Sequence, residues 1–210
     1  MFFMGARGPQ PSLSVAKIVA AAIEVLDAGD AVSVRAVAAR LDVRPNTIYT
    51  YLPDKAALDS AVADRLLELA NPDVLTGRRS WRRRVGDYAV AVRTVLLERP
   101  GAIALFHSAP MNGPAALTVG ERLLDAFAHA GLPDENASRA AYAVMTYALG
   151  AVALSDADSD SEPERAARLA GIPADAFPRS ARTAPVAAMW NGEEQFRWGL
   201  TRLLDGLVSR

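Results

Sequence analysis

Apolar residues recur at intervals of three and four along most of the chain, which is the spacing of one face of an α-helix. Near the beginning, Ser14 and Ser33 stand where they would cap helices, and Gly29 stands where a helix would end. Pro45 opens another helix, because its missing N–H has no partner at a first helical position. This region is therefore predicted to hold four helices, at Leu13 to Gly29, Ser33 to Leu41, Pro45 to Leu52 and Lys55 to Ala70.

The rest of the chain has the same helical periodicity, and the fold class it predicts is all-α. Residues 71–80 are rich in Pro, Gly and polar side chains, so we expect a linker there, and the polar, proline-bearing residues 155–185 predict a mobile loop with one short helix. The predicted helices are Trp81 to Glu98, Gly101 to Ser108, Pro114 to Ala130, Glu135 to Leu154, Glu162 to Ala170 and Glu193 to Ser209.

Composition restricts the protein class and the kind of partner. Hydrophobic residues make up 51% and charged residues 22% of the 210 residues, as in ordinary globular proteins. The formal net charge is −1, so any DNA-binding face must be local. The chain has no cysteine, which excludes disulfides and thiolate metal sites. The start of the chain lacks the apolar stretch of a signal peptide, and the apolar run 140–154 is too short to span a membrane, so we expect a cytoplasmic protein without a membrane partner.

The second and third predicted helices are short and are joined by a tight turn, and they follow a packing helix. These are the ingredients of a helix-turn-helix, in which the second short helix lies in the major groove of DNA. On a helix from Pro45, Ile48 and Leu52 face the core. The opposite face carries polar side chains, at Asn46, Thr47, Thr50 and Tyr51.

In these residues the sequence resembles the TetR family of transcriptional regulators. The resemblance runs through "IVAAAIEVLDAG", "SVRAVAARLDV" and "TIYTYLPDKAALDSAV", and it reappears near the end in "FRWGLTRLLDGL". The C-terminal half is most similar to the tetracycline-repressor type, through "RPGAIALF" and "ERLLDAF". The resemblance implies an N-terminal extension at 1–12, a three-helix helix-turn-helix DNA-binding domain at 13–59, and a larger helical domain at 60–210 that binds an effector and forms a homodimer.

For DNA binding, the resemblance implies base or groove contact by Asn46, Thr50 and Tyr51, and contact with the DNA backbone by Thr47, Tyr49 and Lys55. Asn can bond adenine bidentately, and Thr, Tyr and Lys suit phosphate. Both tyrosines could instead be core aromatics. The full predicted DNA-binding set is Ser33, Val34, Arg35, Arg44, Pro45, Asn46, Thr47, Tyr49, Thr50, Tyr51 and Lys55.

Arg44 stands where a small capping oxygen usually precedes a helix. It cannot accept the N–H bond of a cap, and a cation opposes the helix dipole at this end. The residue makes sense if its guanidinium meets phosphate or guanine.

For the larger domain, the resemblance implies an effector pocket and a four-helix dimer interface. The predicted effector-binding residues suggest an aromatic, largely uncharged ligand, although each could be an ordinary core residue: Leu66, Trp81, Tyr88, Val92, Phe106, His107, Met111, Phe127, Tyr142, Met145 and Tyr147. The predicted interface residues could also bury into their own subunit: Ala143, Gly150, Phe196, Leu200, Leu203 and Leu207. Leu105 stands where the family's metal-binding histidine would fall, so no metal or other cofactor is expected.

Three functions follow, and the leading one is a repressor that leaves a palindromic operator when a small apolar or aromatic effector binds. The first alternative is a helical protein that sequesters a ligand, because basic and acidic residues balance in the first sixty positions. The second is an enzyme that uses His107 with Ser108 or His129 with Asp125, but no nucleophile elbow, phosphate loop or metal constellation supports it. The arginine-rich stretch 78–84 could contact nucleic acid or could pair with acids such as Asp73 and Asp87.

Overall fold

The computed structural model describes residues 13–108, 110–157 and 161–208, and within them every regular element is helical. The predicted N-terminal extension, residues 1–12, lies outside the described residues. Four helices form the N-terminal part: α1 Val15–Asp27, α2 Val34–Arg40, α3 Pro45–Tyr49 and α4 Lys55–Leu69. The remainder holds the 3-10 helices η1 Pro72–Leu75 and η2 Ala102–Ala104, together with α5 Trp81–Leu97, α6 Leu105–Ser108, α7 Pro114–His129, α8 Asp134–Ala157, α9 Glu162–Ala170, α10 Pro178–Ala187 and α11 Glu193–Leu207.

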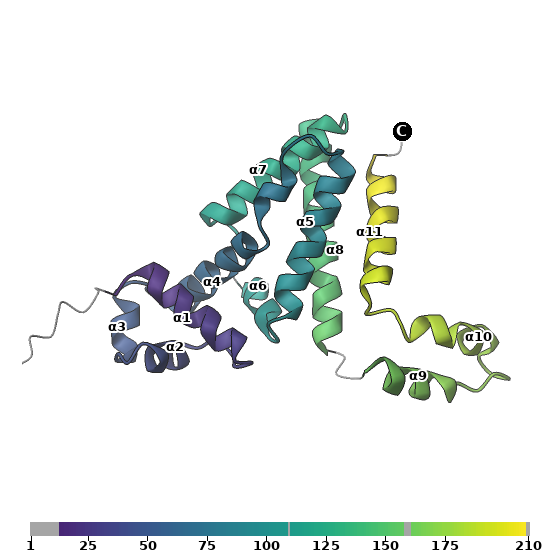
Figure 1. The fold of residues 1–210 in the computed structure, drawn as a ribbon, viewed down its shortest axis with the longest axis horizontal. Helices are drawn as coiled ribbons and strands as arrows, with labels where there is room; N and C mark the ends of the chain where they lie inside the picture. The colour runs from purple at the N-terminus through teal and green to yellow at the C-terminus, as the bar shows by residue number, and fades with distance from the viewer. Residues whose placement is uncertain (1–12, 109, 158–160, 209–210) are drawn as a thin grey trace, which may run out of the picture.

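The helices form three regions along the molecule (Figure 1). Helices α1 to α3 lie at one end, and α4 leads from them into a bundle of α5, α7, α8 and α11. Helices α9 and α10 pack against each other at the opposite end from α1 to α3. Helix α4 contacts α1 as well as α5, α6 and α7, so it connects the N-terminal helices to the bundle.

A single apolar cluster runs through both parts of the molecule. Near the N-terminus it includes Ile18 and Ile48, and in the bundle it includes Tyr88 and Phe127, all fully buried. The α4 helix crosses the predicted domain boundary at residues 59–60 without interruption. The two parts of the molecule therefore share one continuous helix and one packed core.

Most predicted helices are confirmed, and hydrogen bonds at their ends explain where they begin. The Ser14 hydroxyl accepts the Lys17 N–H at 3.3 Å, and the Ser33 hydroxyl accepts the Ala36 N–H at 3.1 Å, so α1 and α2 are capped as predicted. The third helix ends at Tyr49 and is shorter than the predicted span to Leu52. The following Pro53 disfavours helical backbone at Leu52, so the helix cannot continue past that residue.

The predicted linker at 71–80 contains η1, whose Leu75 is fully buried. Its carbonyl accepts a hydrogen bond of 2.9 Å from the buried Arg84 guanidinium. The first half of residues 71–80 is therefore packed beside α5, because the Leu75 side chain is buried and its carbonyl is bonded to Arg84 of α5.

The prediction of a loop with one short helix at 155–185 is wrong for the described part of that segment. Helix α8 continues to Ala157, α9 forms as predicted, and a second helix, α10, occupies Pro178–Ala187; residues 158–160 lie outside the described residues. The prolines concealed α10 from a sequence pattern, although Pro178 suits a first helical turn. Its buried face consists of the small residues Ala184 and Ala187, which give weak apolar periodicity.

The contact between α8 and α11 offers a test of the packing. The Tyr147 hydroxyl donates to the Phe196 carbonyl at 3.0 Å, and a methyl group added at Gly199 would overlap that hydroxyl. We expect Gly199→Ala to lower the free energy of unfolding by about 1 kcal/mol, because the cost of overpacking, about 1 to 3 kcal/mol, exceeds the gain in helix propensity. Urea unfolding monitored by circular dichroism measures the change.

Gly206→Ala is the matched control on the same helix, because a methyl group there meets no atom within 4 Å. It should be neutral or slightly stabilising. Equal destabilisation by the two substitutions would contradict the assigned contact.

Candidate functional site

A tight turn joins α2 to α3 and packs the two helices against each other. Asp42 has a φ of 53°, and aspartate is one of the side chains that tolerate this left-handed conformation. The Val43 N–H then returns to the Ala38 carbonyl at 3.0 Å, which closes the end of α2. Ile48 and Leu52 are buried beneath the turn, as predicted. The geometry is that of a helix-turn-helix.

The opposite side of α3 faces solvent. Tyr49 is 45% exposed and Tyr51 is 39% exposed, so neither is a core aromatic in this chain. Arg44, Asn46 and Thr50 are exposed as well, and Thr47 is half-buried. The predicted DNA-binding residues from Arg44 to Tyr51, in α3 and at its two ends, are thus exposed or half-buried and form an outward row, while Val34 of α2 is buried and contributes packing.

Arg44 begins α3 without any side-chain hydrogen bond to the helix. In contrast, the Asp54 carboxylate at the start of α4 accepts the Ala57 N–H at 2.7 Å. The backbone carbonyl of Arg44 still accepts the Thr47 N–H at 2.8 Å, so the turn closes without help from the side chain. Pro45 has no N–H and the Thr47 N–H is bonded, so what this exposed helix start offers to an anion is the Arg44 guanidinium.

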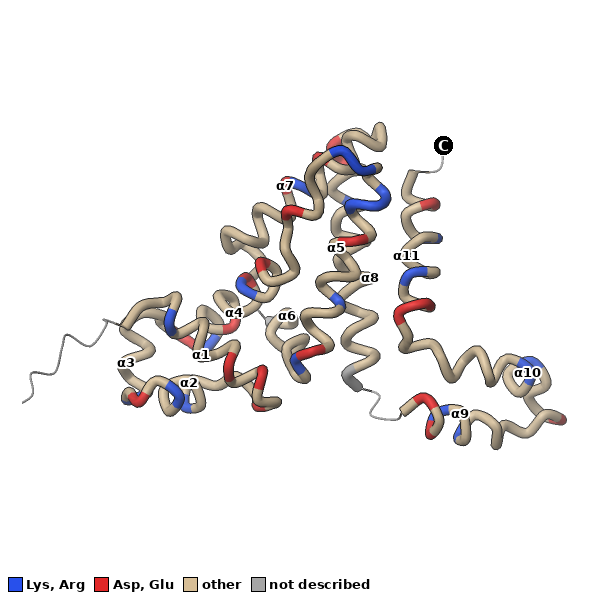
Figure 2. Tube along the Cα trace, in the orientation of Figure 1, with Lys and Arg blue, Asp and Glu red and all other residues tan. Residues whose placement is uncertain are grey.

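Charges of both signs lie along α1 to α3 (Figure 2), and ion pairing separates the cations into two groups. The Arg40 guanidinium contacts the Glu24 carboxylate at 2.8 Å. Arg35 and Arg44 form no ion pair within the described part of the chain. These two guanidinium groups can therefore neutralise phosphates without first breaking an internal pair.

Lys55, predicted to contact the DNA backbone, is not a free cation. Its ammonium contacts the carboxylate of Asp59 one turn later, and Asp59 is buried. Removing the lysine would leave a buried carboxylate without its partner, which is costly. A loss of DNA binding in a Lys55 variant would therefore mix a stability effect with a contact effect.

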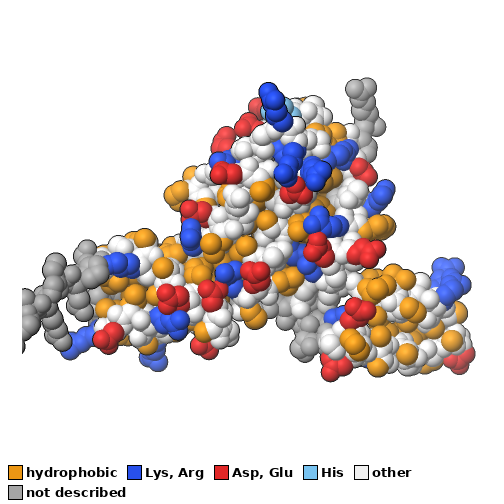
Figure 3. All heavy atoms as spheres, in the orientation of Figure 1, with side chains coloured by type: hydrophobic (Ala, Val, Ile, Leu, Met, Phe, Trp, Pro, Cys, Tyr) orange, Lys and Arg blue, Asp and Glu red, His pale blue; other side chains and the backbone are white. Residues whose placement is uncertain are grey.

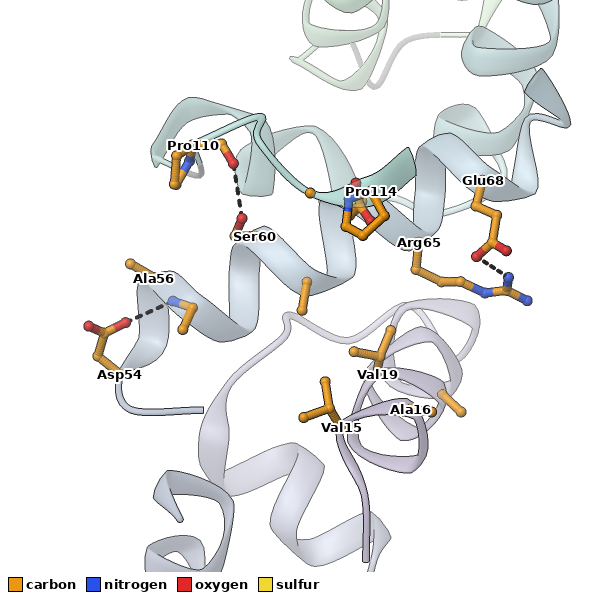
Figure 4. A pocket seen from close by; sticks show the side chains of 15 residues that line it. Val15, Ala16, Val19, Asp54, Ala56, Ser60, Arg65, Glu68, Pro110 and Pro114 are labelled. Atoms are coloured by element: carbon orange, nitrogen blue, oxygen red, sulfur yellow. Dashed lines mark hydrogen bonds and ion pairs between the residues drawn. The ribbon is translucent and has the colours of Figure 1, made fainter. Parts of the chain in front are cut away.

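A groove of about 910 Å³ lies between α1, α4 and the segment that precedes α7 (Figure 4). On one side, the Ser60 hydroxyl donates to the Pro110 carbonyl at 2.9 Å. Deeper in, the Asp64 carboxylate accepts the N–H groups of Ala115 and Ala116 at 3.2 and 2.8 Å. Asp64 thereby caps α7 from another helix, a role that the sequence pattern did not reveal.

The predicted effector residues divide by burial. Leu66, Val92 and Phe127 are core residues, and so is Tyr88, whose hydroxyl donates to the Leu67 carbonyl at 3.2 Å. Burial raises the pKa of Tyr88, while Arg122 lowers it and Asp64 raises it by smaller amounts, so the phenol stays neutral. The other members lie nearer the surface: Trp81, Phe106, Met145 and Tyr147 are half-buried, and His107, Met111 and Tyr142 are exposed.

The predicted dimer residues also lie in two environments. Phe196 and Leu200 are buried against their own subunit, which favours the alternative interpretation for these two positions. Gly150 is exposed on α8, and Ala143, Leu203 and Leu207 are half-buried. The large apolar side chains that face outward on α8 and α11 are instead Tyr142, Leu154 and Trp198.

Ion pairs account for most of the arginine-rich stretch 78–84. Arg79 contacts Asp87 at 3.1 Å, and Arg82 contacts Asp205 of α11 at 2.9 Å. The alternative that these charges pair with acids is therefore supported at Asp87, whereas Asp73 pairs with Arg122 at 2.7 Å.

The proposed enzymatic pair on α7 does not form. His129 Nδ1 lies 2.6 Å from the backbone carbonyl oxygen of Asp125 and not at its carboxylate. Among the residues that the structure describes, no group of three or more His, Cys, Asp or Glu side chains could hold a metal ion. Over the same residues, no helix has the length and apolarity needed to cross a bilayer.

The short helices α2 and α3, with their outward polar row, define the class of this protein as a helix-turn-helix DNA-binding protein. Residues 71–210 match the family model described as tetracyclin repressor-like, C-terminal domain. The chain belongs to this TetR family of transcriptional regulators.

Individual relatives agree with this assignment. The HTH-type transcriptional repressor DrrR1 of Streptomyces coeruleorubidus is 27% identical over 219 residues, which cover 96% of this chain and 79% of that protein. The TetR family protein ActR of Streptomyces coelicolor, solved with (S)-DNPA, has the same fold, with a TM-score of 0.81 at 20% identity over 94% of this chain and 98% of that one. BioQ, solved with its double-stranded DNA operator, has a TM-score of 0.68 at 27% identity over 95% and 100% of the two chains.

Proposed function

We propose that this protein is a cytoplasmic homodimeric repressor whose two α3 helices bind successive major grooves of a palindromic operator, about 34 to 36 Å apart. The observation that carries the proposal is the outward row of α3 together with Arg35 and Arg44, whose guanidinium groups form no ion pair with any described residue. Its relative DrrR1 is named as a repressor, and BioQ was solved with its operator, which supports the same role here.

Within the operator complex, the side chains take different roles. Asn46 can pair with adenine through its amide, and Thr50 and Tyr51 present hydroxyls to the groove. Thr47 and Tyr49 flank this row and suit phosphate oxygens, which positions the protein without reading sequence.

A small apolar or aromatic effector in the C-terminal domain would release the DNA. Such release requires that the effector bind the DNA-free conformation more tightly than the DNA-bound one. Helix α4 supports this mechanism physically, because it packs against α1 and against the effector domain.

The proposed dimer places the outer faces of α8 and α11 against a second copy. Tyr142 is 76% exposed and Trp198 is 60% exposed, and large apolar groups on a surface of this kind favour association. We expect Trp198→Glu to weaken dimerisation by about tenfold or more, because a charge would be buried without a partner. Light scattering after size-exclusion chromatography measures the molar mass over a dilution series.

Leu117→Glu on α7 is the matched control, because this leucine is as exposed as Trp198 but lies outside the proposed interface. It should leave the mass unchanged. A monomeric wild type, or equal dissociation of both variants, would contradict the proposed dimer face.

Gel-shift titrations test DNA recognition, with the DNA upstream of the gene and a scrambled duplex, at several salt concentrations. Wild type should bind the upstream DNA more tightly, with an affinity that falls as salt rises. Asn46→Ala should reduce the preference between the two duplexes, whereas Tyr49→Ala should weaken both complexes. Equal, weak binding of both duplexes by wild type would favour the ligand-sequestering alternative.

A further inference from the structure

A second hollow, of about 450 Å³, is lined by residues of the bundle and of the segment that leads into α11, and by none of α1 to α3. Its walls come from α5, α8, the start of α11 and the connection between α10 and α11. The lining includes the aromatic residues Tyr147, Trp190 and Phe196 and the single cationic residue Arg93. We refer to this hollow as the Arg93 cleft.

Arg93 is only 8% exposed, yet no carboxylate of the described chain lies within ion-pair distance of it. Its Nη2 donates to the Asn191 carbonyl at 2.5 Å, and its guanidinium carbon lies 5.4 Å from the centre of the Phe196 ring. Glu193, which acts on Arg93 electrostatically, accepts a hydrogen bond of 2.6 Å from Arg197 Nε. Arg93 is therefore a desolvated cation whose counter-charge is missing from its contacts.

This arrangement is costly for the protein alone. A buried charge is expensive unless it is paired, and of the five N–H donors of this guanidinium only one, on Nη2, bonds to an acceptor among the described residues. Desolvation lowers the pKa of Arg93, partly opposed by Glu193 and Tyr147. An anion in the cleft would satisfy the remaining donors, and in this partly desolvated site its hydrogen bonds to a charged group would be strong.

The aromatic side chains beside Arg93 indicate that the rest of the ligand is apolar. The rings of Tyr147 and Phe196 are stacked with centroids 5.2 Å apart, and the Tyr147 hydroxyl is already bonded to the Phe196 carbonyl. Trp190 adds a large, exposed ring at the mouth of the cleft. An apolar ring system would pack against these side chains, and the volume falls within the range of small-molecule sites.

We propose that the Arg93 cleft binds a small aromatic carboxylate, with its anionic group on the Arg93 guanidinium and its ring between Tyr147 and Trp190. This ligand differs by one charge from the uncharged effector that the sequence suggests. The inference goes beyond the proposed function, because binding in this cleft does not depend on DNA recognition.

Calorimetry of the purified full-length protein with two matched probes tests the charge requirement. The probes are 2-naphthoate and the neutral isostere 2-naphthamide. Wild type should bind naphthoate at least about tenfold more tightly, as charge-assisted hydrogen bonds predict. Arg93→Gln should abolish this preference while leaving naphthamide affinity within about twofold, because the ring contacts remain.

A second variant blocks the cleft without altering Arg93. Gly150 lines the cleft, and a side chain there would begin in open space. Gly150→Leu should therefore weaken both probes, whereas Gly120→Leu on α7, which also begins in open space, should weaken neither. Because Gly150 is also a predicted interface residue, size-exclusion chromatography of both variants separates blockage of the cleft from a change in oligomeric state.

Three results would overturn the proposal. The first is equal affinity of wild type for the acid and the amide. The second is a preference for the acid that persists in Arg93→Gln, which would place the anion elsewhere. The third is no binding of naphthoate at millimolar concentration, which would mean that the cleft is closed or is filled by a second copy of the chain.

Discussion

Replacing Arg44 with serine is expected to weaken operator binding by about tenfold or more, because a bidentate contact of arginine with guanine is worth about 1 to 3 kcal/mol. The same substitution should raise the free energy of unfolding slightly, by about 0.5 to 1 kcal/mol, because α3 begins at Arg44 without a side-chain cap and serine would supply one. Fluorescence anisotropy with labelled operator and thermal unfolding measure the two effects. Opposite changes in affinity and stability would identify Arg44 as a functional residue kept at a structural cost.

Arg40→Ser is the matched control, since it removes the same charge from the same domain. The Arg40 guanidinium is already bound to Glu24, so we expect only a small change in operator affinity. Wild-type affinity in the Arg44 variant would mean that this side chain is a surface residue in an unfavourable place.

Asp64→Ala is expected to lower the free energy of unfolding by about 2 kcal/mol. Helix α7 begins after Gly113, which has no side chain that could cap the helix. The Asp64 carboxylate instead accepts the N–H groups of Ala115 and Ala116 in the first turn of α7. Loss of the carboxylate leaves both donors half-buried without this acceptor. Urea unfolding measures the change, and Asp64→Asn should give an intermediate value because one carbonyl acceptor remains.

Two further variants define the origin of that effect. Gly113→Ala should also destabilise the protein, since an added methyl group would overlap the Asp64 carboxylate. Asp73→Ala removes a carboxylate that contacts Arg122 on the same helix, but the Asp73 side chain is largely exposed, so the pair should contribute less than about 1 kcal/mol. Equal effects of Asp64→Ala and Asp73→Ala would contradict the capping role.

The candidate DNA face was largely predictable because it depends on short-range chemistry. Pro45 at a first helical position, the buried Ile48 and the outward polar side chains all follow from helical spacing within ten residues. The pairing of Lys55 with a buried Asp59 was not predicted, because the pattern identifies which residues share a turn but not how deeply one of them lies. Which of these side chains contact the operator stays a prediction.

For the effector and dimer residues, helical periodicity predicts which side chains are buried but not what they are buried against. The apolar stripe of α11 predicts that Phe196 and Leu200 are buried, and they are, but the stripe does not say against which partner. In the structure they pack within their own subunit, while Trp198 faces outward. The two prolines of α10 had the opposite effect, because they masked a helix whose buried side chains are only alanines.

By itself, the sequence determined the helical class, most of the helix ends and the helix-turn-helix, because caps, prolines and apolar spacing act over a few residues. The tertiary structure decided the features that depend on residues far apart in the chain. Asp64 caps a helix that begins fifty positions later, and Arg93 meets the carbonyl of Asn191. The physical reason is that a charge or an unsatisfied N–H acquires its role from whatever surrounds it after folding, and that surrounding is not encoded in local spacing.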